Sequence, residues 1–291
     1  MFDCLEVDDG WMERTESSSS WYVHSVFKRV INLVCGQLMV TLATSENTLM
    51  PYTLICSADD FSKYKHLERQ QVEMQTEHIM IANAFGVYLN GRHVSSQYMP
   101  TDMPLETAND KRPLSNIISH IENLYKDQAT PGSFISKPDA TPFSKEMQRM
   151  LEMKTALLCE AVRQRNFVNS TAHAKSLIGL GVGLTPSGDD YLVGFFAVHL
   201  LSLKHTEWFK QLVHAVMDNA EQKTNEISAT YLKSLTDYRF KAEIVSLIKA
   251  VYTQKTAAAL TALNALLQVG STSGSDIAKG MIDAFRLRMV L

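Results

Sequence analysis

Cysteine is scarce in this sequence, with four residues in 291, and no two of them form a C-x-x-C pair. Cys4, Cys35, Cys56 and Cys159 lie far apart. This spacing favours reduced, buried thiols over a disulfide framework or a zinc site. The nine histidines form no H-x-x-x-H and no H-E-x-x-H motif. We therefore expect no zinc centre of the kind that a sequence motif reveals.

Long apolar runs and blocks of positive charge are absent as well. The longest apolar run, at 191–203, is interrupted by Gly194, His199 and Ser202, and it is too short to span a bilayer. The 28 basic and 31 acidic residues give a net charge of −3 without a basic block, which argues against a nucleic-acid partner. The acidic first ten residues do not resemble a secretory signal. We expect a cytoplasmic protein with neither a membrane nor a nucleic-acid partner.

The composition is that of an ordinary globular protein, with 45% hydrophobic and 20% charged residues. The length suggests two domains of about 150 residues each, and one large domain is the alternative. Before residue 140, β-branched and aromatic runs alternate with turn residues, whereas from Phe143 onward apolar residues recur at helical spacing. These patterns predict an α+β protein, with a β-rich N-terminal domain over residues 1–140 and an all-helical C-terminal domain over residues 141–291.

Individual elements follow from the same patterns. Cys35-Gly36-Gln37 predicts a hairpin turn, and Asn90-Gly91 is a second strong turn signal. Ser17–Ser20 predicts a flexible or turn segment, 97–113 a loop and 129–142 a linker. The predicted strands are Trp21–Leu33, Leu38–Ala43, Tyr52–Cys56, Val72–Met74 and His78–Leu89. The predicted helices cover residues 114–125, 143–166, 169–177, 186–203, 206–222, 225–236, 240–253, 256–268 and 274–289.

Glycines are concentrated in two short segments of the helical half, although glycine is costly inside helices. The first segment has glycines at 179, 181, 183, 188 and 194 and reads G-L-G-V-G-L-T-P-S-G-D-D. Thr185 as N-cap and Pro186 at the first helical position predict a helix start. Free N–H groups at such a start favour an anion. The carboxylates of Asp189 and Asp190 fit there if they cap amides, or hold a cation or a substrate amide.

The second segment repeats the first. Aligning Ser187-Gly188 with Ser273-Gly274 places Asp190 over Asp276 and Gly194 over Gly280, so that S-G-x-D-x-x-x-G occurs twice, 86 residues apart. A helix follows each copy, and the glycine one turn later would let another helix pack closely. We therefore expect the two helix starts to meet, with both aspartates facing one ligand.

These considerations select the candidate site residues. Asp190 and Asp276 are the candidate catalytic residues, and no metal ligand set is predicted, although a divalent cation at Asp189 and Asp190 remains open. Two ordinary helix caps and a solvated polar helix face are the alternative interpretations. The candidate substrate- or anion-binding residues are Gly181, Gly183, Thr185, Ser187, Gly188, Asp189, Thr272, Ser273, Gly274, Ser228 and Arg239. Ser228 shares a predicted helix face with Thr224 and Tyr231, and Arg239 suits a bidentate contact to a carboxylate or phosphate.

The run G-V-G-L-T-P-S-G-D-D at 181–190, the later T-S-G-S-D at 272–276 and F-K-R-V-I-N-L at 27–33 resemble a bacterial family that includes the AllH-type subunit of oxamate carbamoyltransferase. The resemblance spans about residues 20–289. Two positions depart from the pattern: Val182 stands where a proline is frequent, and Ser271 where a histidine often precedes T-S-G. No role of that histidine is carried over.

The resemblance implies a cytoplasmic subunit that works with two other proteins in anaerobic breakdown of allantoin, a source of purine nitrogen. The implied reaction interconverts oxalurate plus phosphate with oxamate plus carbamoyl phosphate, so the implied ligand is a small anionic or carbamoyl substrate. The S-T-R-T phosphate motif of the classical carbamoyltransferases is absent. A catalytic subunit and a non-catalytic ligand-binding or assembly subunit are both compatible with the sequence.

Overall fold

The computed structural model describes residues 1–16, 20–103, 112–135, 139–202 and 206–291. Most of the predicted segment Ser17–Ser20 and parts of the predicted loop 97–113 and linker 129–142 lie outside these residues. The chain forms two compact units. One contains Met1–Gln97 together with Arg239–Ala242, and the other contains Tyr98–Tyr238 together with Glu243–Leu291.

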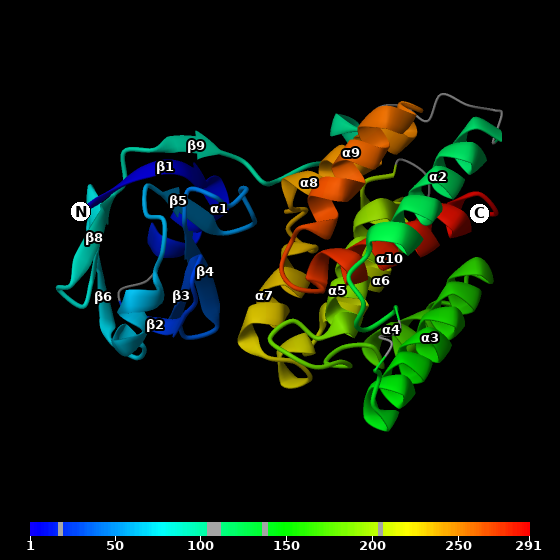
Figure 1. The fold of residues 1–291 in the computed structure, drawn as a ribbon, viewed down its shortest axis with the longest axis horizontal. Coiled ribbons are helices and arrows are strands. Elements are labelled where there is room, and N and C mark those ends of the chain that lie inside the picture. Colours follow the sequence, from blue (N-terminus) through cyan, green and yellow to red (C-terminus); the bar gives the residue numbers. More distant parts are fainter. Residues whose placement is uncertain (17–19, 104–111, 136–138, 203–205) are drawn as a thin grey trace. The chain divides into compact units, whose positions relative to one another are not determined.

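The first unit, called the barrel unit below, is built from short strands and one helix (Figure 1). Its elements are β1 (Phe2–Asp8), α1 (Asp9–Glu16), β2 (Trp21–Val26), β3 (Val30–Cys35), β4 (Leu38–Ala43), β5 (Thr53–Cys56), a 3₁₀ turn (Ser62–Leu67), β6 (Gln71–Met74), β7 (His78–Ile81), β8 (Phe85–Tyr88) and β9 (Arg92–Val94).

Eight of these strands close into a barrel. The order of neighbours is β5-β4-β3-β2-β6-β7-β8-β1, and β1 pairs antiparallel with β5 to complete the ring, while β9 adds to β1 in parallel. Closure pairs strand edges that would otherwise offer free N–H and C=O groups to another chain. Side chains of alternate residues fill the interior: Trp21 and Val23 are buried, whereas Tyr22 between them is exposed.

The second unit, called the helical unit below, holds the remaining helices, and α10 lies against α2, α5 and α9 (Figure 1). Its elements are a 3₁₀ turn (Pro100–Asp102), α2 (Arg112–Gln128), α3 (Pro142–Arg163), α4 (Phe167–Lys175), α5 (Ser187–Leu200), α6 (Thr206–Met217), a 3₁₀ turn (Ala220–Gln222), α7 (Glu226–Ser234), α8 (Ala242–Tyr252), α9 (Thr256–Leu267) and α10 (Ser273–Arg288). Every residue of α5 is buried, so this helix forms the core of the unit.

The structure confirms the predicted α+β class, with strands first and helices after them. A helix occupies each of the eight positions predicted from residue 143 onward, and the β3–β4 hairpin turns at Gly36 as expected. The boundary between the units, however, follows Gln97 rather than residue 140. Helix α2 belongs to the helical unit because it packs on α9 and α10.

Several predicted strands differ in detail. The run Trp21–Leu33 forms two strands, β2 and β3, and the run His78–Leu89 is split into β7 and β8 by a turn at Ala82 and Asn83, both of which have positive φ. Asn90-Gly91 does not close a hairpin, since β8 and β9 both pair in parallel with β1. Strand β1 was not predicted, because its short apolar alternation is interrupted by a bulge between Cys4 and Glu6.

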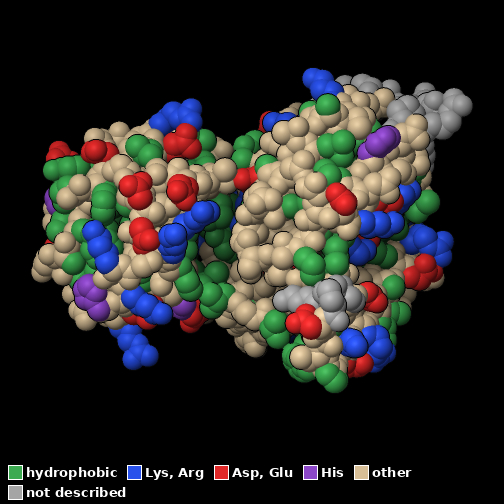
Figure 2. All heavy atoms as spheres, viewed as in Figure 1, with side chains coloured by type: hydrophobic (Ala, Val, Ile, Leu, Met, Phe, Trp, Pro, Cys, Tyr) green, Lys and Arg blue, Asp and Glu red, His purple; other side chains and the backbone are tan. Residues whose placement is uncertain are grey.

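The visible face of the barrel unit carries acidic and basic side chains intermixed (Figure 2). Among the described residues, no helix combines the length and the apolar character needed to cross a membrane.

Candidate functional site

The first glycine-rich segment forms an irregular loop that leads into α5. Gly181 has a φ of +134°, and a Cβ at this position would lie 2.4 Å from the backbone nitrogen of Ser187. Only glycine therefore permits this path of the chain. The loop is fastened at its ends by hydrogen bonds from Leu180 N to Leu177 O (3.0 Å) and from Gly188 N to Leu180 O (2.8 Å).

The middle of this loop keeps its backbone donors available. Within the described part of the chain, the N–H groups of residues 181–185 donate no hydrogen bond to another residue. The side chains of Val182 and Leu184 are exposed, so the loop lies at the surface. A row of unused amides at the start of a buried helix is the arrangement that attracts an anion.

The start of α5 differs by one residue from the prediction. Pro186 is the N-cap, and no side chain caps the helix. Thr185, predicted to be the N-cap, instead has its hydroxyl 2.7 Å from the hydroxyl of Ser273 at the start of α10. The predicted cap is therefore wrong, because Thr185 is used to join the two helix starts.

Helices α5 and α10 meet as the repeated motif predicts. A Cβ on Gly194 would lie 2.0 Å from the carbonyl oxygen of Ile277, and a Cβ on Gly280 would lie 2.0 Å from that of Tyr191. Tyr191 and Ile277 occupy equivalent positions of the two motifs, so each helix inserts its glycine against the same turn of the other. This reciprocal contact confirms that the two helix starts lie together.

Asp276, in the first turn of α10, is almost fully buried, with 1% of its surface exposed. Its Oδ2 accepts a hydrogen bond from Ser133 Oγ (3.1 Å), and Ser187 also hydrogen-bonds to this carboxyl. Burial and the nearby charge of Asp190 raise the pKa of Asp276 to about 7, although the two serine hydroxyls act in the opposite direction. At neutral pH this carboxyl can therefore both donate and accept a proton.

Ser133 was not among the predicted site residues. Its hydroxyl contacts the hydroxyl of Ser187 and donates to the carboxyl of Asp276, and the nearby Thr130 donates its N–H to Ser275 Oγ (2.9 Å). The predicted linker 129–142 thus supplies a third segment to the site. Its proline-glycine-serine sequence indicates only a turn, and nothing in it marks Ser133 as a partner of α10.

Asp189 has a different environment from its neighbour Asp190. It accepts hydrogen bonds from Gly179 N (2.8 Å), Thr224 Oγ1 (2.5 Å) and Ser228 Oγ (2.7 Å), and burial raises its pKa. Both oxygens of this carboxyl therefore accept from protein donors. Asp189 and Ser228, both predicted to bind substrate, link the glycine-rich loop to the start of α7.

We expect Asp189→Ala to destabilise the helical unit by about 2–4 kcal/mol, because three donors would lose their buried acceptor. Urea unfolding measures this loss. Asp218→Ala, at an exposed position, is the matched control and should change the unfolding free energy by less than about 0.5 kcal/mol. Equal stability of the two variants would show that Asp189 does not brace the loop.

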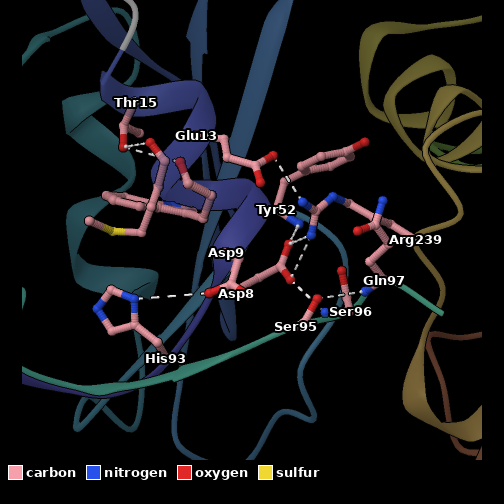
Figure 3. Close-up of polar contacts among 12 residues, drawn as sticks. Asp8, Asp9, Glu13, Thr15, Tyr52, His93, Ser95, Ser96, Gln97 and Arg239 are labelled. Atoms are coloured by element: carbon pink, nitrogen blue, oxygen red, sulfur yellow. Dashed lines mark hydrogen bonds and ion pairs between the residues drawn. The ribbon is translucent and has the colours of Figure 1, made fainter.

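The structure does not place Arg239 with the other predicted residues. Arg239 belongs to the barrel unit, where its guanidinium lies 3.3 Å from Asp8 Oδ1 and 2.9 Å from Glu13 Oε2 (Figure 3). Asp8 also accepts from the backbone N–H groups of Tyr52 and Ser96, each at 2.8 Å. In the barrel unit, the Arg239 guanidinium is therefore bound to the carboxylates of Asp8 and Glu13.

The remaining predicted residues lie in the first turns of α5 and α10. Gly188 and Gly274 are buried and use their N–H groups on Leu180 O and Val269 O (2.8 and 2.9 Å). Thr272 is the N-cap of α10. Among the described residues, no group of three or more His, Cys, Asp and Glu side chains is arranged to hold a metal ion.

Two family comparisons match this chain, one in each unit. Residues 177–285 match the family described as oxamate carbamoyltransferase subunit AllH. Residues 4–94 match the AllH family N-terminal domain. The first match begins just before the glycine-rich loop and ends within α10, so it covers both copies of the repeated motif. No solved structure matches the chain.

Proposed function

Since the chain belongs to the family of oxamate carbamoyltransferase AllH subunits, we propose that it binds the small substrates of such an enzyme at the paired starts of α5 and α10. The proposed reaction is the phosphorolysis of oxalurate, which gives oxamate and carbamoyl phosphate. The observation that carries the proposal is the meeting of two helix N-termini around a buried carboxyl whose pKa is about 7.

The loop at 181–185 supplies the anion-binding part of this proposal. Its unused N–H groups and the positive ends of two helix dipoles favour a carboxylate or a phosphate oxygen. Gly183, where a Cβ would have nothing within 4 Å, leaves room for such a group to approach the backbone. Ser187 and Ser273 add hydroxyl groups at the same end of the two helices.

Asp276 supplies the acid–base part. In the proposed reaction a phosphate oxygen forms a bond to the ureido carbon, and the bond from that carbon to the oxamate nitrogen breaks. The departing nitrogen needs a proton, which the protonated carboxyl of Asp276 donates and regains from the attacking phosphate. A carboxyl that is about half protonated near pH 7 suits this exchange. Asp190 keeps Asp276 protonated by raising its pKa.

We further propose that the chain acts in the cytoplasm with two other subunits, in anaerobic allantoin breakdown, as the family resemblance implies. A second candidate function is a non-catalytic ligand-binding or assembly subunit. It is favoured by one observation: Gly194 and Gly280 serve helix packing, and the N–H groups of Gly188 and Gly274 are bonded within the protein. In that case the site binds a ligand while a partner carries the reacting groups.

Phosphorus NMR on the purified three-subunit complex, supplied with oxalurate and phosphate, tests the proposal. We expect carbamoyl phosphate to form with the complete complex. Loss of the product when this chain is omitted supports a required subunit, and loss with Asp276→Asn in an assembled complex supports the catalytic version. An assembled complex in which Asp276→Asn keeps full turnover would favour the second candidate, and an inactive wild-type complex would contradict the reaction.

A further inference from the structure

A stripe of polar side chains continues from the candidate site along α10. Asp276, Lys279 and Asp283 follow one another at spacings of three and four residues, which places them on one face of the helix. Asp276 is 1% exposed, whereas the side chains of Lys279 and Asp283 are 29% and 20% exposed. The stripe therefore runs from the buried carboxyl at the helix start towards the surface.

All three members of this stripe have protein partners. Lys279 Nζ lies 2.5 Å from Asp283 Oδ1, and the hydroxyl of Tyr191, from α5, donates to Asp283 Oδ2 (3.0 Å). Asp276 accepts from Ser133, as described above. Both oxygens of Asp283 are therefore engaged within the protein.

Tyr125 lies on another helix, α2, close enough to this stripe to feel the charges of Asp276 and Asp283. It is 7% exposed, and its buried hydroxyl has no hydrogen-bond partner among the described residues. Helix α2 is fastened to α10 by the ion pair of Glu122 with Arg286, and this pairing turns the face that carries Tyr125 towards α10. Burial, together with the negative charges of Asp276 and Asp283, raises the pKa of this hydroxyl, which therefore stays protonated.

A buried hydroxyl without a partner is unfavourable, so this position suits a ligand that brings the missing acceptor. A phosphate is a poor occupant of this position, because two carboxyl groups lie near it. A carbamoyl or primary amide group fits better, since its carbonyl oxygen accepts from the phenol while its N–H groups donate to a carboxylate.

We propose that Tyr125 is a substrate-positioning residue whose hydroxyl donates to the carbonyl oxygen of a carbamoyl or primary amide group, while Asp276 accepts from the nitrogen of that group. The amide end of the ligand then lies at Tyr125 and Asp276, and its anionic end lies at the amides of 181–185. This inference rests on the proposed function and specifies which end of the substrate each part of the site takes.

The test compares Tyr125→Phe with the wild type in calorimetric titrations with oxamate, oxalate and inorganic phosphate. Oxalate matches oxamate in size but replaces the amide by a second carboxylate. We expect the wild type to prefer oxamate to oxalate. Tyr125→Phe should bind oxamate about tenfold more weakly, the scale of one hydrogen bond, and phosphate with unchanged affinity. Its unfolding free energy should be equal to that of the wild type or higher, because no protein partner is lost.

Tyr252→Phe is the matched control. Tyr252 is also a buried tyrosine of the helical unit, but its hydroxyl donates to Val198 O (3.3 Å). This variant should lose stability and keep oxamate affinity, the reverse of the pattern for Tyr125→Phe. Unchanged oxamate affinity in Tyr125→Phe, or a loss of stability in that variant, would overturn the inference. Tyr125→Phe could bind oxamate more weakly while the wild-type complex is inactive. That result would support the amide-binding role of Tyr125 and contradict only the proposed reaction.

Discussion

Asp276→Asn is expected to lower the rate of carbamoyl phosphate formation by about 100- to 1000-fold, the contribution of a positioned general acid. Asparagine keeps the size of the side chain and can still accept from Ser133 and Ser187, but it cannot give a proton to the departing nitrogen. Turnover of the assembled complex, followed by phosphorus NMR, measures the loss. If the turnover rate fell by less than about threefold, Asp276 would not be the general acid of the reaction.

The same variant has a signature in stability. Burial raises the pKa of Asp276 from 3.8 to about 7, so between these values the folded chain binds more protons than the unfolded chain. The Asp276 contribution to the free energy of unfolding therefore falls as pH rises through this window, by at most about 1.4 kcal/mol per pH unit. Asp276→Asn should remove this slope and should be the more stable protein above pH 7. An unchanged slope would show that the carboxyl is ionised normally.

Asp190→Asn serves as the companion variant. The charge of Asp190 is the second cause, after burial, of the raised pKa of Asp276. Its removal should lower that pKa, so the loss of activity on the alkaline side should begin at a lower pH than in the wild type. A pH–rate profile distinguishes this shift from a simple loss of turnover.

Gly280→Ala is expected to destabilise the helical unit by about 3 kcal/mol or more, at the upper end of the cost of overpacking. The added Cβ would meet the Tyr191 carbonyl at 2.0 Å, and this atom belongs to a buried helix backbone that cannot rotate away. Gly194→Ala should cost a similar amount, because its Cβ would meet the Ile277 carbonyl at the same distance. Urea unfolding of both variants measures the effect.

Gly183→Ala is the control for this pair. Gly183 has a positive φ of 95°, but a Cβ there would have nothing within 4 Å. Its replacement should cost only the backbone strain of about 1–2 kcal/mol. If Gly280→Ala were no more destabilising than Gly183→Ala, α5 and α10 would not pack as closely as the structure shows.

The contact of α5 with α10 could be predicted because its signal is local and occurs twice. S-G-x-D-x-x-x-G places a helix start, a carboxylate and a contact glycine at fixed spacing, and this pattern needs no knowledge of the rest of the chain. The roles of Asp189 and Asp190 could not be separated in the same way. Adjacent helical residues point about 100° apart, so the two carboxyls face different elements, and only the structure shows which element lies on each side.

Pairings between distant residues also escaped prediction. Arg239 meets Asp8 across 231 positions in the sequence, and no periodicity links the two. Ser133 is similar, since it lies in a segment whose composition indicates only a turn. Strand β1 is held by β5 and β8, which are far from it in the sequence, so its own short alternation carries little signal. Tertiary packing determines where such residues lie, and the local sequence pattern carries no information about contacts with distant segments.

The most direct test of the central claim is a titration of the chain labelled with ¹⁵N-glycine, in which phosphate and oxamate are added and the amide resonances are followed. If the paired helix starts bind the anionic end of the substrate, the amides of Gly181 and Gly183 should shift with saturation, whereas that of Gly36, in the barrel unit, should stay in place. Saturable binding of either ligand without a shift at Gly181 and Gly183 would contradict the site.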